Sequence, residues 1–370
     1  MVVLKHNPRL LFALVRSDYR PLQPVYLLLF NGGKVATVPA TQPEILVDAI
    51  LEAIQDSGHS AILISGIRQH PRKFLITTAE GNEIYLFVFA WTLTHGGRTR
   101  LPDEYRIQMT SVASPLQIST EGPTILIGFE PNLKMFAGFD LNRHRTFTTG
   151  SPSVQIDIGA VRKAVDDGIA FDKKSNDEIA IGIRPDQLLN YALNASDLHK
   201  YGKETTTLRL LSKASSLQSI PSADLSTLSE PRQRIVQTVS RLSRAANFRL
   251  QVLNAYGNRC AVTRAQLRLV DAAHILPVGA PGSADHVRNG LALSPTLHRA
   301  YDAALIYLND NLEMKLNAKR EAELRGSRLD SGLEEFTRLL GKIHLPADRR
   351  QWPDVAFISK ANRFRLIPRF

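Results

Sequence analysis

Apolar runs of strand length dominate the first half of the chain. Some runs are continuous and others alternate with polar residues, and both patterns predict β-strands. The Gly81-Asn82 pair between two of the runs is a hairpin signal. The runs lie at Val25–Phe30, Ala61–Ile67, Lys73–Thr77, Glu83–Thr92, Tyr105–Thr110, Thr124–Phe129 and Lys134–Phe139.

Apolar residues at helical spacing interrupt these runs. Pro43–Gln55 is the clearest predicted helix, and two shorter helices are expected at Ala160–Asp167 and Pro185–Leu193. After the middle of the chain, Pro231–Tyr256 is a long predicted helix that opens with proline and closes before Gly257. Antiparallel strands with a few helices, and no strict alternation of strand and helix, favour the α+β class.

The composition changes between Thr205 and Pro231, which contains seven serines, two prolines and no aromatic residue in 27 positions. Such a segment is typical of a connector, although its leucines are able to dock locally. A chain of 370 residues is long enough for two hydrophobic cores. We therefore predict a mixed α+β domain at residues 1–204, a Ser-rich linker at 205–230 and a second domain at 231–370.

The positive charge of the chain lies in its second half. Residues 1–200 hold 20 Lys and Arg against 20 Asp and Glu, whereas residues 201–370 hold 26 against 15. Within 201–300 the counts are 13 and 5. A solvated basic face is the ordinary explanation of such an excess, whereas a polyanionic partner is the functional one.

Several classes of protein are excluded by what the sequence lacks. It has no run of about 18 apolar residues that would span a bilayer. The first residues show no secretory signal pattern, so we expect a cytoplasmic protein without a membrane partner. Cys260 is the single cysteine, which rules out an internal disulfide and a zinc ribbon built from cysteine pairs.

Candidate chemistry gathers between Cys260 and Asp302. His274 ends a short apolar run, and a neutral imidazole there is able to deprotonate water. His298 and Asp302 are four residues apart on a predicted helix, so their side chains share one face and can share a divalent ion. Nitrogen and oxygen ligands together suit Mg²⁺, Mn²⁺, Ni²⁺ and Zn²⁺. Alone, each signal is weak, because a structural histidine or a surface hydrogen bond gives the same pattern.

Four ordered blocks strengthen the signal, and they are Tyr256–Thr263, Ala272–Pro277, Arg288–Leu293 and Leu297–Asp302. Together they resemble the HNH endonuclease family, and more closely its branch in bacterial restriction endonucleases, over roughly residues 230–370. The resemblance implies a ββα-metal unit, in which two short strands and a helix surround one divalent ion.

The resemblance also implies roles for single residues. His274 corresponds to the general base, Asn289 to the residue that holds the intervening loop, and His298 to a metal ligand. Asp302 stands where relatives often have a further ligand. Hydroxide would attack phosphorus in line and leave 5′-phosphate and 3′-hydroxyl ends. The expected ion is Mg²⁺ or Mn²⁺, with Ni²⁺ or Zn²⁺ as alternatives.

The chain departs from the family pattern in two places. Many relatives have Asp or His directly before the base, whereas this chain has Ala273. Either the ion keeps more waters or Asp271 becomes a ligand. Many relatives also carry cysteine pairs for a structural zinc ion, which Cys260 alone cannot provide.

The resemblance implies double-stranded DNA as the substrate, and palindromic sites would favour a homodimer. We expect a metal-dependent endonuclease of restriction type whose first domain reads a specific or modified sequence. The alternatives are a monomeric nickase of homing or phage type and a non-catalytic DNA-binding regulator on the same scaffold. Candidate DNA contacts lie on the long helix, beside the motif residues and in a Gly-containing loop of the first domain, and they are Arg241, Arg244, Arg249, Arg288, Arg299, Arg98 and Arg100.

Overall fold

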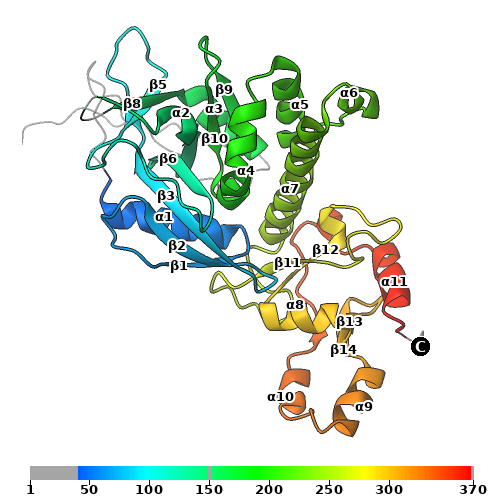
Figure 1. The fold of residues 1–370 in the computed structure, drawn as a ribbon. Helices are drawn as coiled ribbons and strands as arrows, with labels where there is room; N and C mark the ends of the chain where they lie inside the picture. The colour runs from blue at the N-terminus through cyan, green and yellow to red at the C-terminus, as the bar shows by residue number, and fades with distance from the viewer. Residues whose placement is uncertain (1–40, 149, 151, 368–370) are drawn as a thin grey trace, which may run out of the picture. The chain divides into compact units, whose positions relative to one another are not determined.

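The protein has an α+β fold, as the sequence predicted (Figure 1). The computed structural model describes residues 41–148, 150 and 152–367, so the strand expected at Val25–Phe30 lies outside the described residues. The largest sheet has the order β1-β2-β3-β6-β7-β10-β9. Its neighbours are antiparallel except β3 and β6, which are parallel. The strands are β1 Ser60–Leu63, β2 Arg72–Thr77, β3 Glu83–Thr92, β6 Thr124–Glu130, β7 Met135–Phe139, β9 Ile169–Lys173 and β10 Ile179–Ile183.

Alternation along β3 supplies side chains to two different cores, because successive residues of a strand point to opposite faces. Leu86 and Val88 belong to one buried cluster, whereas Phe89 and Trp91 belong to another. The first cluster also takes residues from α1 (Pro43–Asp56), α4 (Leu188–Tyr201) and α5 (Thr205–Ser215). The second takes residues from α3 (Ile158–Asp167) and from a smaller sheet made of β4 (Thr94–His95), β5 (Glu104–Gln108) and β8 (Ser153–Asp157).

The Ser-rich segment at residues 205–230, which was predicted to be a linker, contains helices. Besides α5, it includes α6 (Ser222–Ser226). Leu210, Leu211 and Ala214 of α5 are fully buried in the first core. Their spacing follows one face of a helix, and the high serine content hid this pattern. The domain limits themselves stay a prediction.

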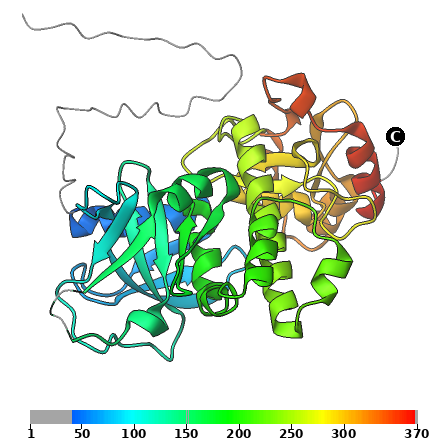
Figure 2. The ribbon, with the colours of Figure 1, turned by 90° about the horizontal axis from the view of Figure 1, so that it is seen from above.

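Helix α7 (Glu230–Ala255) contributes to two cores in succession. Ile235 and Val236 pack in the first core, and Phe248 and Val252 pack in a third cluster built by the rest of the chain. Both ribbon views show α7 beside α5 (Figures 1 and 2). The long helix predicted at Pro231–Tyr256 is therefore present with nearly the expected ends.

The third cluster is surrounded by short elements. Two of them form the strand pair β11 (Asp271–His274) and β12 (Gly290–Leu293), which α8 (Pro295–Asp302) follows directly. The elements beyond α8 were not predicted from the sequence. They are β13 Ile306–Leu308, β14 Glu313–Leu316, α9 Ala318–Gly326, α10 Leu333–Thr337, β15 Gly341–Lys342 and α11 Val355–Phe364. The remaining short helices are α2 Leu141–His144 and the 3-10 turns Pro185–Gln187, Val287–Asn289 and Arg349–Gln351.

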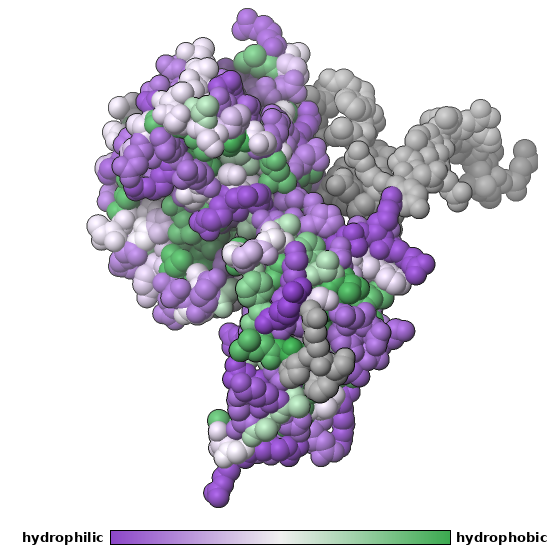
Figure 3. All heavy atoms as spheres, turned by 90° about the vertical axis from the view of Figure 1, so that its right-hand side faces the viewer, coloured by the Kyte–Doolittle hydropathy of each residue, from purple (hydrophilic) through white to green (hydrophobic). Residues whose placement is uncertain are grey.

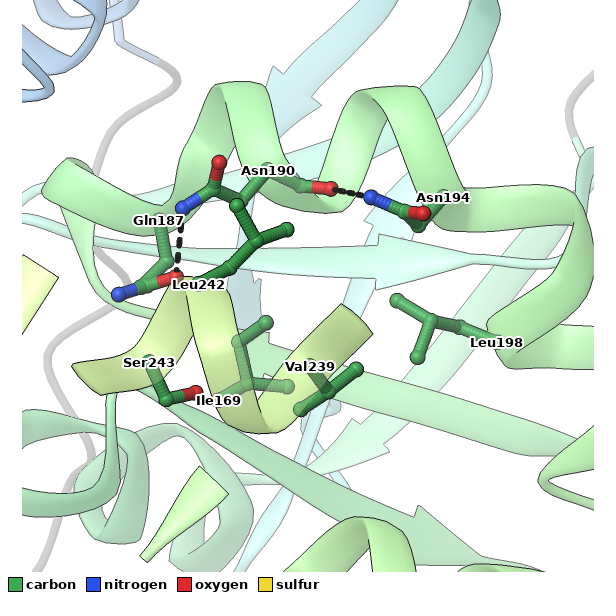
Figure 4. A pocket seen from close by; sticks show the side chains of 8 residues that line it. All are labelled: Ile169, Gln187, Asn190, Asn194, Leu198, Val239, Leu242 and Ser243. Carbon is green, nitrogen blue, oxygen red and sulfur yellow. Dashed lines mark hydrogen bonds between the residues drawn. The ribbon is translucent and has the colours of Figure 1, made fainter. Parts of the chain in front are cut away.

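A cavity of about 10 Å³ lies between α4 and α7 (Figure 4). Gln187 lines it, and the side-chain nitrogen of this buried residue has no hydrogen-bond partner, although its oxygen accepts from Asn190. The volume matches about one water molecule. The cavity is thus too small for a substrate. None of the described helices has both the length and the apolar composition that a membrane crossing requires.

Candidate active site

The strand pair and the helix after it bring the three motif histidine and asparagine residues into one small unit. In the antiparallel register His274 lies opposite Gly290, and Asp271 lies opposite Leu293. The chain then turns through Ser294 into α8, which carries His298. Residues separated by 24 positions in the sequence thus meet across a strand pair and one helix.

His274 is held between an aromatic ring and a carboxylate. Its imidazole stacks on Phe248 of α7, with ring centroids 3.8 Å apart and planes 12° from parallel. Its Nε2 lies 3.0 Å from Oδ1 of Asp285, which comes from the loop between β11 and β12. A carboxylate only accepts hydrogen bonds, so Nε2 carries the proton and Nδ1 keeps the lone pair of the neutral ring.

The environment of His274 favours the neutral form. Burial lowers the pKa of this imidazole below its ordinary value, the hydrogen bond and charge of Asp285 raise it in part, and the net direction is downward. A neutral imidazole at physiological pH is the form that a general base requires.

Asn289 is fully buried and holds the loop that carries Asp285. Its Oδ1 accepts from the backbone nitrogen of Leu276 at 2.8 Å, and its Nδ2 donates to the carbonyl oxygens of Leu276 and Ala284 at 3.1 and 3.0 Å. Its own carbonyl oxygen accepts from the backbone nitrogen of Ile275, the residue after His274. The amide therefore joins both ends of the loop.

His298 lies between two carboxylates. Its Nδ1 is 3.5 Å from Oδ2 of Asp271, and its Nε2 is 3.3 Å from Oδ2 of Asp302. The hydrogen bond with Asp271 raises the pKa of His298 above its ordinary value, against the effect of burial. Burial acts to raise the pKa of Asp271, but the hydrogen bond from His298 and the charge of Arg249 lower it overall.

Comparison with protein families assigns this unit. A family model described as HNH endonuclease matches residues 260–309, which hold β11, β12 and α8. The chain contains an HNH endonuclease domain. The resemblance predicted from the motif blocks is thereby confirmed, and the nuclease domain implies endonuclease activity.

Other comparisons describe the rest of the chain. A family model described as Methylase-associated X1 matches residues 84–192, which include the strands from β3 to β10. A solved structure described as the modification dependent TagI restriction endonuclease is similar, with 13% sequence identity and a TM-score of 0.27 over 81% of this chain and 86% of that chain. No curated protein matches the sequence.

HNH endonucleases typically use a divalent metal ion. Asp271, His298 and Asp302 offer one nitrogen and carboxylate oxygens, a donor set that fits such an ion in type. In residues 41–367, apart from positions 149 and 151, no group of three or more His, Cys, Asp and Glu side chains is arranged to hold a metal. Each nitrogen of His298 instead faces a carboxylate.

The arginines predicted to bind DNA fall into two groups. Arg249 is engaged inside the protein, since its guanidinium donates to Asp271 at 3.3 Å and to the carbonyl oxygen of Val270 at 3.1 Å. The structure thus gives it a role in holding Asp271. Arg288 pairs with Asp354 at 3.0 Å but stays exposed. The other predicted contacts are also exposed, and they are Arg241, Arg244, Arg299, Arg98 and Arg100.

Two residues that sequence reasoning missed complete the surroundings of His274. Asp285 lies four positions before Asn289, and its place in the motif loop was the signal available. Phe248 lies one helical turn before Val252 on the buried face of α7, a spacing that is typical of a core residue. Only the packing of α7 against the strand pair shows that its ring supports His274.

Proposed function

We propose that the protein is a metal-dependent DNA endonuclease of restriction type that cuts double-stranded DNA to 5′-phosphate and 3′-hydroxyl ends. The observation that carries the proposal is the position of His274. Its imidazole is stacked on Phe248 and hydrogen-bonded to a carboxylate, and burial lowers its pKa and so favours the neutral form. The same small unit holds a second cluster of one histidine and two carboxylates. A base beside a candidate metal site is what hydrolysis of a phosphodiester requires.

In this mechanism, Nδ1 of His274 takes a proton from a water molecule as the water oxygen forms a bond to phosphorus. The bond from phosphorus to the 3′ oxygen breaks, and that oxygen gains a proton from solvent. Asp285 accepts a hydrogen bond from Nε2–H throughout and stabilises the imidazolium that forms. Asn289 keeps Asp285 in place through the loop.

We assign Asp271, His298 and Asp302 as the residues that would hold the ion, Mg²⁺ or Mn²⁺ before Ni²⁺ or Zn²⁺. Such an ion, when bound, supplies a positive charge that stabilises the phosphorane-like transition state and the departing oxygen. Arg249 fixes one oxygen of Asp271, and Asp302 stands one helical turn from His298. The ligand assignment thus uses residues that already contact one another.

The rest of the proposal concerns recognition. The family that matches residues 84–192 is described as methylase-associated, which supports a role for this domain in reading a specific or modified DNA sequence. We propose residues 1–204 as the reading domain, residues 205–230 as the connection and residues 231–370 as the nuclease domain. A homodimer would place two cutting centres on a symmetric site. The exposed arginines named above would contact DNA phosphates or bases.

Digestion of plasmid DNA tests the proposal. We expect the purified full chain to cleave methylated or unmethylated plasmid with Mg²⁺ or Mn²⁺, and His274→Ala to bind the same DNA without cutting it. Cleavage that leaves one strand intact would indicate the nickase alternative. Binding without cleavage by the unaltered protein, under every metal and methylation state, would indicate the regulator and contradict the proposal.

A further inference from the structure

The C-terminal helix α11 lies beyond the residues that the HNH family model matches, yet it packs into the same core. Ile358 and Ala361 of α11 are fully buried in the cluster that also contains Ile275. The side chain of Asn362 donates to the carbonyl oxygen of Leu308 at 2.9 Å. The helix is therefore held on the nuclease domain by both apolar and polar contacts.

Arg365 at the end of α11 reaches both halves of the active site. Its Nη1 donates to the carbonyl oxygen of Ile275 at 2.8 Å, and Ile275 is the residue directly after His274. Its guanidinium carbon also lies 4.2 Å from the ring centre of Tyr301. Tyr301 is buried in α8, directly before Asp302 and three positions after His298.

The other end of α11 meets the far end of the same loop. Asp354, which caps α11, pairs with Arg288 at 3.0 Å, and its backbone nitrogen donates to the carbonyl oxygen of Arg288 at 3.0 Å. Between these ends, a Cβ placed on Gly282 would lie 3.0 Å from Nζ of Lys360. The helix thus contacts the β11–β12 loop at its start, middle and end.

We propose that Arg365 is a positioning residue, which links the strand carrying the general base to the helix carrying two of the candidate metal ligands, His298 and Asp302. The proposal rests on the nuclease function proposed above. A guanidinium suits this task because its planar fork can donate to a carbonyl oxygen while its face lies on an aromatic ring. Loss of the hydrogen bond to Ile275 and of the contact with Tyr301 lets His274 and His298 move independently. Small displacements of reacting groups lower reaction rates by large factors.

A contact with DNA is the other role open to an arginine, and the geometry disfavours it. The guanidinium of Arg365 is half-buried and already bonded inside the protein. By contrast, Arg363 is exposed, and its guanidinium donates to the carbonyl oxygen of Ser359 on its own helix. The side of the molecule where α11 lies shows hydrophilic residues with hydrophobic patches between them (Figure 3). Arg363 therefore offers a matched control that removes the same charge two positions away.

The test compares Arg365→Gln and Arg363→Gln in the full chain. We expect Arg365→Gln to lower kcat for plasmid cleavage by about 10- to 100-fold, with KM for DNA changed by less than about twofold. Arg363→Gln should keep the unaltered kcat. Arg365→Lys keeps a positive charge and a hydrogen-bond donor but lacks the planar guanidinium that lies on the Tyr301 ring. Its kcat should therefore lie between those of Arg365→Gln and Arg363→Gln.

A second readout needs neither metal nor DNA. In a histidine proton NMR titration, the resonance missing from His274→Ala identifies this imidazole. We expect the pKa of His274 to rise toward its ordinary value in Arg365→Gln, because a loosened strand end lets water reach the ring. Arg363→Gln should leave the titration unchanged.

Specific outcomes overturn the inference. If Arg365→Gln has the same kcat as Arg363→Gln, Arg365 has no positioning role. If Arg365→Gln has a raised KM for DNA and an unchanged kcat, Arg365 is instead a DNA contact. If Arg365→Gln does not fold, Arg365→Lys decides by the same criteria. Should the unaltered protein fail to cut DNA, the proposed function falls, whereas an unaltered His274 titration in Arg365→Gln contradicts the positioning role on its own.

Discussion

Replacement of Gly290 by alanine tests whether the close approach of α7 to β12 fixes the position of the Phe248 ring against His274, the proposed base. Gly290 lies opposite His274 in the strand pair and is fully surrounded by protein. Its φ of −125° and ψ of 146° are extended values that any residue adopts, so alanine introduces no backbone strain. The effect of the substitution is therefore purely steric.

The structure gives the size of the clash. An added Cβ would lie 2.2 Å from Cγ2 of Val252 and 3.2 Å from Cζ of Phe248. Carbon atoms in contact prefer about 3.5 to 4.0 Å, so α7 must retreat by more than about 1 Å or the strand must bend. Overpacking of this kind costs about 1–3 kcal/mol of unfolding free energy. Movement of Phe248 also shifts the ring on which His274 rests.

Urea unfolding and plasmid cleavage measure the two consequences. We expect Gly290→Ala to lower the unfolding free energy by about 2 kcal/mol and kcat by up to about 100-fold. Gly326→Ala is the matched control, because nothing lies within 4 Å of a Cβ at that helical position. It should be neutral or stabilise the protein by at most about 1 kcal/mol.

The reasoning fails if Gly290→Ala unfolds at the same urea concentration as the unaltered protein and cuts DNA at the same rate. That result would mean that α7 accommodates a side chain at β12 without moving Phe248. A lower unfolding free energy with unchanged kcat would show that the contact of α7 with β12 affects stability but not catalysis.

Two further predictions concern the base and its loop. Because a lowered pKa keeps His274 neutral to lower pH, kcat should rise with pH and reach half its plateau below pH 6.5. Burial and His298 lower this pKa, whereas Asp285 and Asp302 raise it, so Asp285→Asn should shift the midpoint of the profile to still lower pH. A midpoint at or above pH 6.5 in the unaltered protein would refute the assignment of His274 as the base. Asn289→Ala leaves the buried backbone nitrogen of Leu276 without its acceptor and should cost about 1–3 kcal/mol in urea unfolding, whereas a change below about 0.5 kcal/mol would show that the loop is held by other contacts.

Local patterns in the sequence predicted much of the fold. The strands β2, β3, β5, β6 and β7 and the helices α1, α3 and α7 lie where alternation and helical spacing placed them, because both periods arise from backbone geometry within a few residues. Strands β9 and β10 were missed, since each is a five-residue run beside helices. The serine-rich segment, predicted as a connector, contains the helices α5 and α6, and Leu210 and Leu211 of α5 are buried.

The candidate site also has features that the sequence predicted and features that only the structure showed. The sequence by itself determined the order of strand, loop, strand and helix and the chemical types at His274, Asn289 and His298, because motif spacing is a local property of the chain. Tertiary structure alone decided that Phe248 stacks on the ring of His274 and that Arg365 reaches Ile275, 90 positions away. Such partners are chosen by the shapes of surfaces that meet only when the core closes, and no local pattern records them.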